Sequence, residues 1–406
     1  MSDSRYPLVT PLHLSHFTAS SCLGYGLEAT LAALRQQRGG LAPCRFETIS
    51  DLDTHVGEVP KVDDCPLPAP LAEYECRNNR LAFLGLQQDG FSSAINAAIA
   101  RHGRRRVGIL LGTSTSGILQ TEQAYRRRDP HTGALPDDFV YRTTHNTYSV
   151  AGFVRHWFRL EGPAMVVSTA CSSSAKVFAS AARMLAAGVI DAAIVGGVDS
   201  LCLTTLYGFN ALELLSPDTC RPFDRDRKGI SIGEAAAFVL LERAGPSLDA
   251  EAVLLLGTGE SSDAYHMSAP HPEGLGAKMA MAAALQSAGL KAADIDYINL
   301  HGTATPSNDA AEGKAVLALF GARTPCSSTK GATGHTLGAA GGLETVISAL
   351  ALQQAFLPGG INTLHLDPAI PIQYLTANSD IAPRRVMSNS FGFGGTNCSL
   401  VLGRAG

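Results

Sequence analysis

The chain has 406 residues, a formal net charge of −4, 45% hydrophobic residues and 17% charged residues. The charged fraction is below the roughly 25% of typical soluble domains, which excludes a disordered chain and predicts a large interior of small, closely packed residues. The slightly acidic balance argues against a general nucleic-acid binder, because such proteins usually carry a basic domain.

The nine cysteines are odd in number and are scattered without the CxxC spacing of a structural zinc site. We therefore expect reduced thiols, a cytoplasmic protein and no bound metal. Residues 1–17 lack the charged and apolar regions of a signal peptide, so we expect none. Uncharged apolar runs are all shorter than the roughly 18 residues of a membrane span, so we expect no such span.

Short apolar runs alternate with longer Ala-rich stretches along the chain. The Pro- and Asp-rich stretch 51–70 predicts a loop, and residues 104–118 predict a strand that ends in a loop of small residues. Residues 171–188 have apolar side chains at helical spacing and end in Gly188, where a helix terminator belongs. Further buried strands are predicted at 163–170, 191–201, 234–243 and 250–262. This alternation predicts an α/β fold whose central strands are buried on both faces.

A faint internal repeat is visible in the order of the elements. Residues 166–188 and 324–356 each contain a strand, a turn of small polar residues and a long helix. We place the boundary between two similar halves in the turn at 245–249, giving residues 1–248 and 249–406. Two such halves packed face to face would bring both turns to one central site.

Cys171 is the first candidate for chemistry, because it stands where a buried strand meets the start of a helix. Its neighbours are Ala170 and three serines, which would let a substrate approach the sulfur. The positive end of the helix dipole favours a thiolate, the form that acts as a nucleophile. The alternative is a buried inert cysteine, which is our interpretation of the other eight.

Two histidines lie in separate glycine-flanked loops. His301 follows a short strand, with Asp309 and Glu312 in the helix after it, and His335 lies five residues after Lys330. A lone histidine is usually a core or surface residue, but two in such loops favour a functional site. Residues 392–395, Gly-Phe-Gly-Gly, predict a backbone that approaches a ligand closely, with a tight β-turn as the alternative.

Four motifs occur in the order and spacing of one family. They are Thr-Ala-Cys-Ser-Ser-Ser around Cys171, His-Gly-Thr-Ala-Thr-Pro from His301, Gly-Ala-Thr-Gly-His around His335, and Asn-Ser-Phe-Gly-Phe-Gly-Gly-Thr-Asn before the C-terminus. With them the sequence resembles the β-ketoacyl-acyl-carrier-protein synthases, condensing enzymes of the thiolase superfamily. The resemblance implies a five-layered αβαβα fold of two similar halves.

The resemblance also implies a decarboxylative Claisen condensation between an acyl chain on Cys171 and malonyl-acyl carrier protein, in fatty-acid or polyketide and polyene synthesis. His301 and His335 would hydrogen-bond the malonyl thioester carbonyl. The backbone N–H groups of Cys171 and Phe393 would form the oxyanion hole, and the Phe393 ring would gate the sulfur. Lys330 would support the histidines by pairing with a nearby acid, for which the candidates are Asp309, Glu312 and Glu344.

Further roles follow from the same resemblance. The phosphopantetheine arm would be delivered by the carrier protein, so no separate cofactor is expected. Substrate contacts are expected at Thr303, Thr305, Gly394, Gly395, Thr115 and Ile118. Docking of the acidic carrier protein is expected at Arg77, Arg80 and Arg127, with a solvated surface as the alternative for each arginine run. The chain would form a homodimer or a heterodimer with a related subunit.

Three alternatives remain at the level of sequence. A degradative thiolase would need a second cysteine just before the C-terminal glycine cluster, whereas Cys398 follows it. A non-catalytic partner subunit that sets chain length would lack the nucleophile. A carrier-binding module without turnover would keep the arginines and need no Cys/His/His set. The loop at 112–118 differs from that of common housekeeping relatives, which leaves the preferred acyl chain open.

Overall fold

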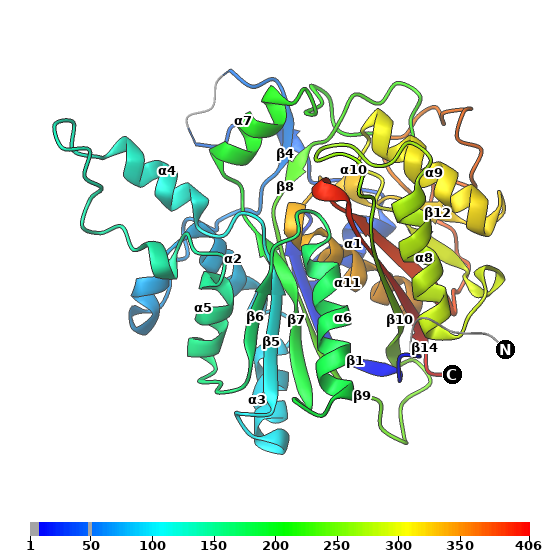
Figure 1. Ribbon diagram of the computed structural model, residues 1–406, viewed down its shortest axis with the longest axis horizontal. Helices are drawn as coiled ribbons and strands as arrows, with labels where there is room; N and C mark the ends of the chain where they lie inside the picture. The colour runs from blue at the N-terminus through cyan, green and yellow to red at the C-terminus, as the bar shows by residue number, and fades with distance from the viewer. Residues whose placement is uncertain (1–7, 48–50) are drawn as a thin grey trace.

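One continuous 11-stranded sheet runs through the molecule in a computed structural model that describes residues 8–47 and 51–406 (Figure 1). Ten of its strands form two groups of five, here called the N-terminal sheet and the C-terminal sheet. The strands of the N-terminal sheet are β1 (Leu12–Ser21), β5 (Val107–Gly112), β6 (Ala164–Val167), β7 (Ala192–Asp199) and β9 (Ala235–Arg243). The strands of the C-terminal sheet are β10 (Val253–Ser262), β11 (Tyr297–Asn299), β12 (Cys326–Ser327), β13 (Arg385–Phe391) and β14 (Thr396–Arg404).

The two sheets have the same topology. Numbered along the chain within each half, the strands lie side by side in the order 3-2-4-5-1. In both halves strands 2, 3 and 4 are parallel, whereas strand 5 is antiparallel to strands 4 and 1. A short pairing of β1 with β10 joins the sheets. The expected pair of similar halves is confirmed, while the boundary after residue 248 stays a prediction.

Helices cover both faces of each sheet, which gives the five layers αβαβα (Figure 1). The middle layer consists of α1 (Gly26–Arg35), α6 (Ser173–Ala186) and α11 (Ala340–Gln353). The outer layers consist of α2 (Arg77–Leu86), α3 (Phe91–His102) and α5 (Ser149–Trp157) on one side, and α8 (Leu275–Ala288) and α9 (Pro306–Phe320) on the other. The expected fold class is therefore confirmed.

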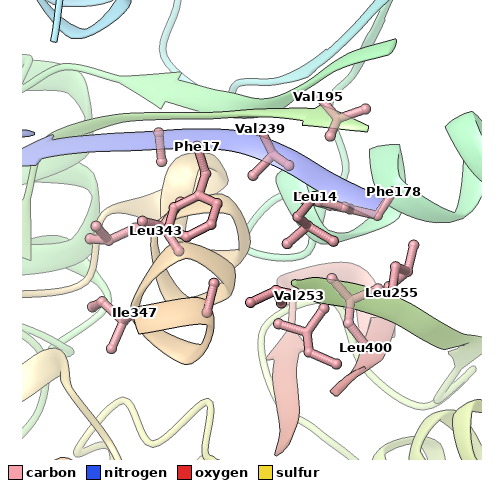
Figure 2. Close-up of a cluster of buried hydrophobic side chains, with 14 of the residues drawn as sticks. Leu14, Phe17, Phe178, Val195, Val239, Val253, Leu255, Leu343, Ile347 and Leu400 are labelled. Carbon is pink, nitrogen blue, oxygen red and sulfur yellow. The ribbon is translucent and has the colours of Figure 1, made fainter. Parts of the chain in front are cut away.

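The hydrophobic pattern explains this layering. Along β9, Val239 and Leu241 face the middle layer while Phe238 and Leu240 face the outer one, so the strand is apolar throughout. Helix α11 is buried on all sides, which is why its sequence lacks a polar face. In Figure 2, Leu343 and Ile347 of α11 belong to the cluster of buried side chains between the sheets.

The predicted elements of the central body are confirmed. The stretches predicted as strands contain β5, β6, β7, β9 and β10. The predicted helix is α6, and Gly188 follows it with a left-handed φ of 68°. The prediction of a loop at 51–70 is wrong in part. Residues His55–Gly57 form strand β4, in which Val56 is buried in the core.

Smaller elements lie around the body. They are β2 (Gly24–Tyr25), β3 (Ala42–Pro43), β8 (Ile232–Gly233), α4 (Ile118–Arg126), α7 (Leu203–Ala211), α10 (Lys330–Thr333) and the short helices at Ala69–Tyr74, Tyr141–Thr143, Ala292–Asp294, Leu337–Ala339 and Phe393–Gly395. Among the described residues, no helix combines the length and apolar character needed to cross a bilayer. The expectation that residues 1–17 are not a signal peptide lies in part outside the described residues, which begin at residue 8.

Candidate active site

The three side chains predicted to carry the chemistry meet between the two halves. Cys171 lies between β6 and α6, His301 follows β11, and His335 follows α10. The Cys171 Sγ atom and one ring nitrogen of each histidine lie within 4.8 Å of one another. The Nε2 atom of His335 is 3.0 Å from Sγ, and the two imidazole centroids are 5.3 Å apart. The two repeated turns therefore do converge on one site.

A strained turn presents the sulfur. Ala170 has a φ of 51°, a left-handed conformation that a non-glycine residue adopts at a cost. Small side chains hold the turn: the hydroxyl of Ser173 accepts from the N–H of Thr169 at 2.9 Å, and the hydroxyl of Ser172 donates to the carbonyl of Thr169 at 2.9 Å. The serines after Cys171 thus fix the position of its sulfur.

Both imidazoles are neutral and carry their proton on Nε2. The Nδ1 atom of His335 accepts from the N–H of Leu337 at 3.2 Å, and Nδ1 of His301 faces the ammonium of Lys330 at 3.4 Å. A ring that accepts at Nδ1 must hold its proton at Nε2 when neutral. Burial lowers the pKa of both rings well below its usual range, and the charge of Lys330 lowers it further. The site therefore offers two neutral N–H donors beside the sulfur.

Lys330 pairs with Glu344, the third of the three acids considered. Its ammonium donates to the Glu344 carboxylate and to the carbonyl of His301 at 2.6 Å. Burial raises the pKa of Glu344 to about 7, against the lowering effect of Lys330. Asp309 accepts instead from the N–H of Phe223 at 2.8 Å.

Glu312 supports the loop of His301 directly. Its two carboxylate oxygens accept from the backbone N–H groups of His301 and Gly302, each at 2.8 Å. Burial raises the pKa of Glu312 to about 7, while these two bonds lower it. Glu312 therefore fixes the backbone beside the imidazole of His301 rather than pairing with Lys330.

The thiol of Cys171 rests in its neutral form. Burial raises its pKa to about 11, against the lowering effects of the Lys330 charge and of the backbone N–H groups of Phe393 and Cys171. The expectation that the helix dipole favours a thiolate is therefore wrong for the resting site, because desolvation outweighs it. The oxyanion hole expected from these two N–H groups stays a prediction.

A pocket opens onto these residues. Thr303, Thr305 and Phe393 line it together with Cys171 and both histidines. The hydroxyls of Thr303 and Thr305 lie 3.0 Å apart, and the ring of Phe393 lies 5.8 Å from that of Phe209 on α7. Loop 263–270 and helix α7 also contribute to the wall. The sequence analysis missed both, because neither carries a motif and only the folded chain brings them here.

Four expected substrate contacts do not border this pocket. Gly394 and Gly395 belong to the neighbouring turn, where the N–H of Gly394 donates to the carbonyl of Met267 at 2.8 Å. Thr115 is 1% exposed and its hydroxyl and N–H both bind Asp199 at 2.8 Å. Ile118 packs against the cluster around Leu201. Substrate contact by Thr115, Ile118, Gly394 and Gly395 stays a prediction, because this pocket does not include them.

The predicted docking residues differ in exposure. Arg77 is 1% exposed and is bound by buried Glu234 at 2.6 Å, so the prediction that it docks a carrier protein is wrong. Arg80 is largely covered and binds Glu75. Arg127 is exposed and pairs with Asp138 at 2.8 Å. Docking by Arg80 and Arg127 stays a prediction.

The sulfur and the two rings are also close enough to hold a metal ion. However, a ring that accepts at Nδ1 carries its proton on Nε2, the nitrogen that would have to bind the metal. The nearby ammonium of Lys330 also repels a cation. The donor set therefore fits hydrogen bonding better than metal binding.

A thiolase-type fold with one cysteine facing two neutral imidazole donors defines a condensing enzyme. The family model described as "Beta-ketoacyl synthase, N-terminal domain" matches residues 86–246, and the one described as "Beta-ketoacyl synthase, C-terminal domain" matches residues 252–364. The chain therefore belongs to the β-ketoacyl synthase family, whose members are acyltransferases. This membership overturns the alternative of a degradative thiolase.

Several relatives agree with this assignment. The 3-oxoacyl-acyl-carrier-protein synthase 2 of Rhizobium meliloti is 39% identical over 319 residues, 73% of this chain and 74% of the relative. The enzyme of the same name from Vibrio cholerae is 31% identical over 412 residues, 95% of this chain and 96% of the relative. Among solved structures, a ketosynthase in complex with its chain length factor from Xenorhabdus doucetiae matches with a TM-score of 0.87, 39% identity and 98% coverage of both chains.

Proposed function

We propose that this chain is the catalytic subunit of a decarboxylative condensation between an acyl group on Cys171 and a malonyl group on acyl carrier protein. One observation carries the proposal: Sγ of Cys171 lies 3.0 Å from Nε2 of His335, with His301 as a second neutral donor beside it. A non-catalytic chain-length subunit would lack the nucleophile, and a carrier-binding module would have no use for the paired donors.

In the first half-reaction, the sulfur of Cys171 attacks the acyl thioester carbonyl. The backbone N–H groups of Cys171 and Phe393 donate hydrogen bonds to the carbonyl oxygen as negative charge develops on it. Collapse forms the Cys171 thioester and breaks the bond to the carrier, whose thiolate takes up the proton lost by Cys171. The thioester energy is conserved, because one thioester replaces another.

In the second half-reaction, the malonyl thioester carbonyl accepts hydrogen bonds from Nε2 of His301 and of His335. The two donors stabilise the enolate that forms when the carboxylate leaves as CO₂. The enolate carbon then attacks the acyl carbonyl on Cys171, and the same two N–H groups stabilise the second oxyanion. Expulsion of the sulfur leaves a β-ketoacyl carrier and a Cys171 thiolate that regains a proton. Each lost donor costs about 100- to 1000-fold in rate.

The partner of this reaction is an acyl carrier protein, whose phosphopantetheine arm we place along Thr303 and Thr305. No other cofactor is needed for the chemistry. We propose that the chain works in the cytoplasm as a dimer, either with a second copy or with a related subunit. The second arrangement is supported by similar structures described as ketosynthases with a chain length factor.

A condensation assay tests the proposal directly. The enzyme is mixed with malonyl carrier protein and a panel of acyl carriers that differ in length and unsaturation, alone and with a related subunit. We expect β-ketoacyl carrier and one CO₂ per product by mass spectrometry. Cys171→Ser should abolish the product, whereas Cys398→Ser, at another buried cysteine, should retain it. Product formation that survives Cys171→Ser would overturn the proposal.

A further inference from the structure

Asp199 is a buried carboxylate shared by two loops of the active site. It is the last residue of β7 and is 0% exposed. Its Oδ1 atom accepts from hydroxyl and backbone donors of residues 113–115 at 2.7 to 2.8 Å. Its Oδ2 atom accepts from the N–H of Gly338. One side chain of the N-terminal half therefore holds the segment that follows His335 in the C-terminal half.

On one side, the held loop reaches the turn of the nucleophile. The hydroxyl of Ser114 lies 3.4 Å from the carbonyl of Ala170, the residue before Cys171. The loop is itself constrained, because Ser116 has a φ of 45° and its N–H donates to the hydroxyl of Thr113 at 3.1 Å. Ser114 thus links Asp199 by hydrogen bonds to the backbone that positions the sulfur.

On the other side, the held segment sets the proton of His335. Leu337 has a φ of 51°, and its N–H donates to Nδ1 of His335 at 3.2 Å. A left-handed conformation is unfavourable for a non-glycine residue, so it persists only where neighbouring contacts hold it. The next residue, Gly338, provides such a contact through its bond to Asp199.

Any side chain at Gly338 would have to displace the groups packed against it. A Cβ atom there would lie 2.7 Å from Oγ of Ser114 and 2.8 Å from Oδ2 of Asp199. The two loops therefore meet at Asp199 without a gap, and the position of one constrains the position of the other.

We propose that Asp199 is a positioning residue for His335: it holds Gly338, and through it Leu337, so that the Leu337 N–H occupies Nδ1 and leaves the imidazole proton on Nε2, facing the sulfur. The role rests on the proposed function, in which that Nε2–H group is a donor to the malonyl carbonyl. Asp199 itself touches neither substrate nor sulfur in this arrangement.

The amide of Asp199→Asn tests this chemistry with little change in shape. All five groups around the carboxylate donate hydrogen bonds. A carboxylate accepts hydrogen bonds at both oxygens, whereas an amide accepts them only at its one oxygen. The NH₂ group of the new asparagine must therefore face the donors of one of the two loops, and the hydrogen bonds to that loop are lost. The matched control is Asp224→Asn, because Asp224 is also buried and accepts backbone N–H groups from Leu364 and His365 without leading to a catalytic ring.

Two readouts separate positioning from general stability. In ¹⁵N-histidine-labelled enzyme, with His335 assigned by comparison with His335→Ala, we expect the wild type to show the proton on Nε2. Asp199→Asn should move part of that population to the other tautomer, while Asp224→Asn should not. Release of CO₂ from malonyl carrier should fall about 100-fold in Asp199→Asn, with single-turnover acylation of Cys171 reduced much less.

The proposal is overturned if Asp199→Asn keeps the wild-type tautomer, or if acylation and decarboxylation fall equally in it. If Asp199→Asn does not fold, Gly338→Ala serves instead, because its methyl group pushes the Gly338 N–H away from the carboxylate while the charge stays. A wild-type enzyme that makes no CO₂ from malonyl carrier would refute the proposed function, whereas the tautomer comparison would still decide the role of Asp199.

Discussion

Nε2 of His335 lies 3.0 Å from Sγ of Cys171, with the imidazole as the donor and the sulfur as the acceptor. This direction differs from that of a general base, which would accept the thiol proton at that nitrogen. The histidine is therefore suited to donate, first toward the sulfur and then toward a substrate carbonyl. The sulfur, for its part, stays protonated until an acyl thioester arrives.

Alkylation of Cys171 should become faster as the pH rises toward 11. The thiol has a pKa of about 11, so below that value the thiolate fraction grows about tenfold per pH unit. We expect the rate of inactivation by iodoacetamide to rise steadily from pH 7 to 10, measured as lost condensation with the label mapped by mass spectrometry. Label on partly exposed Cys44 and Cys65 should accumulate without loss of activity. A plateau near pH 8, or inactivation with the label elsewhere, would contradict this prediction.

Replacing either catalytic histidine should separate the two half-reactions. His301→Ala and His335→Ala each remove one Nε2–H donor from the enolate oxygen, so release of CO₂ from malonyl carrier should fall about 100- to 1000-fold. The oxyanion hole for acylation consists of backbone N–H groups, which neither variant changes. Transfer of an acyl group to Cys171, followed by intact-protein mass spectrometry, should therefore survive in large part. Equal loss of both steps would refute this division of roles.

Removing the charge of Lys330 should make decarboxylation sensitive to acid. Burial, and after it the charge of Lys330, lowers the pKa of both imidazoles, so in the wild type they stay neutral and the rate should be flat down to about pH 6. In Lys330→Met the pKa of each ring rises, and the rings gain a proton as the pH falls. The rate of CO₂ release should then begin to fall at a higher pH than it does in the wild type. An unchanged pH profile in this variant would show that the charge does not tune the rings.

The sequence predicts those parts of the fold and site that depend on local pattern. An apolar run such as 234–243 has to be buried on both faces, and β9 is. Cys171, His301 and His335 stand next to small residues and glycines whose special backbone is local, as the strained Ala170 and Leu337 show. In these cases the residues that cause the structure are close together in the sequence, so the sequence alone predicts it.

The remainder depends on contacts between distant residues. Three acids were candidates for Lys330, and only the packing of α11 selects Glu344. Arg77 begins a helix and resembles a surface residue, but Glu234, distant in the chain, binds it in the interior. The helix dipole at Cys171 is visible in the sequence, whereas the desolvation that outweighs it depends on the whole fold.

Arg77 should stabilise the fold without affecting carrier binding. It is 1% exposed and its guanidinium donates to buried Glu234 at 3.1 and 2.6 Å. Breaking a buried ion pair leaves an unpaired charge, so Arg77→Met should lower the free energy of unfolding by about 3–5 kcal/mol, measured by denaturant titration. Adding Glu234→Gln should restore part of that loss, because the unpaired charge is then removed. The KM for carrier protein should stay unchanged in the folded fraction of Arg77→Met.

Arg127→Met is the comparison at an exposed arginine, where any change should appear in that KM and not in stability. A raised KM in Arg77→Met with unchanged stability would contradict this prediction and show that Arg77 takes part in carrier docking.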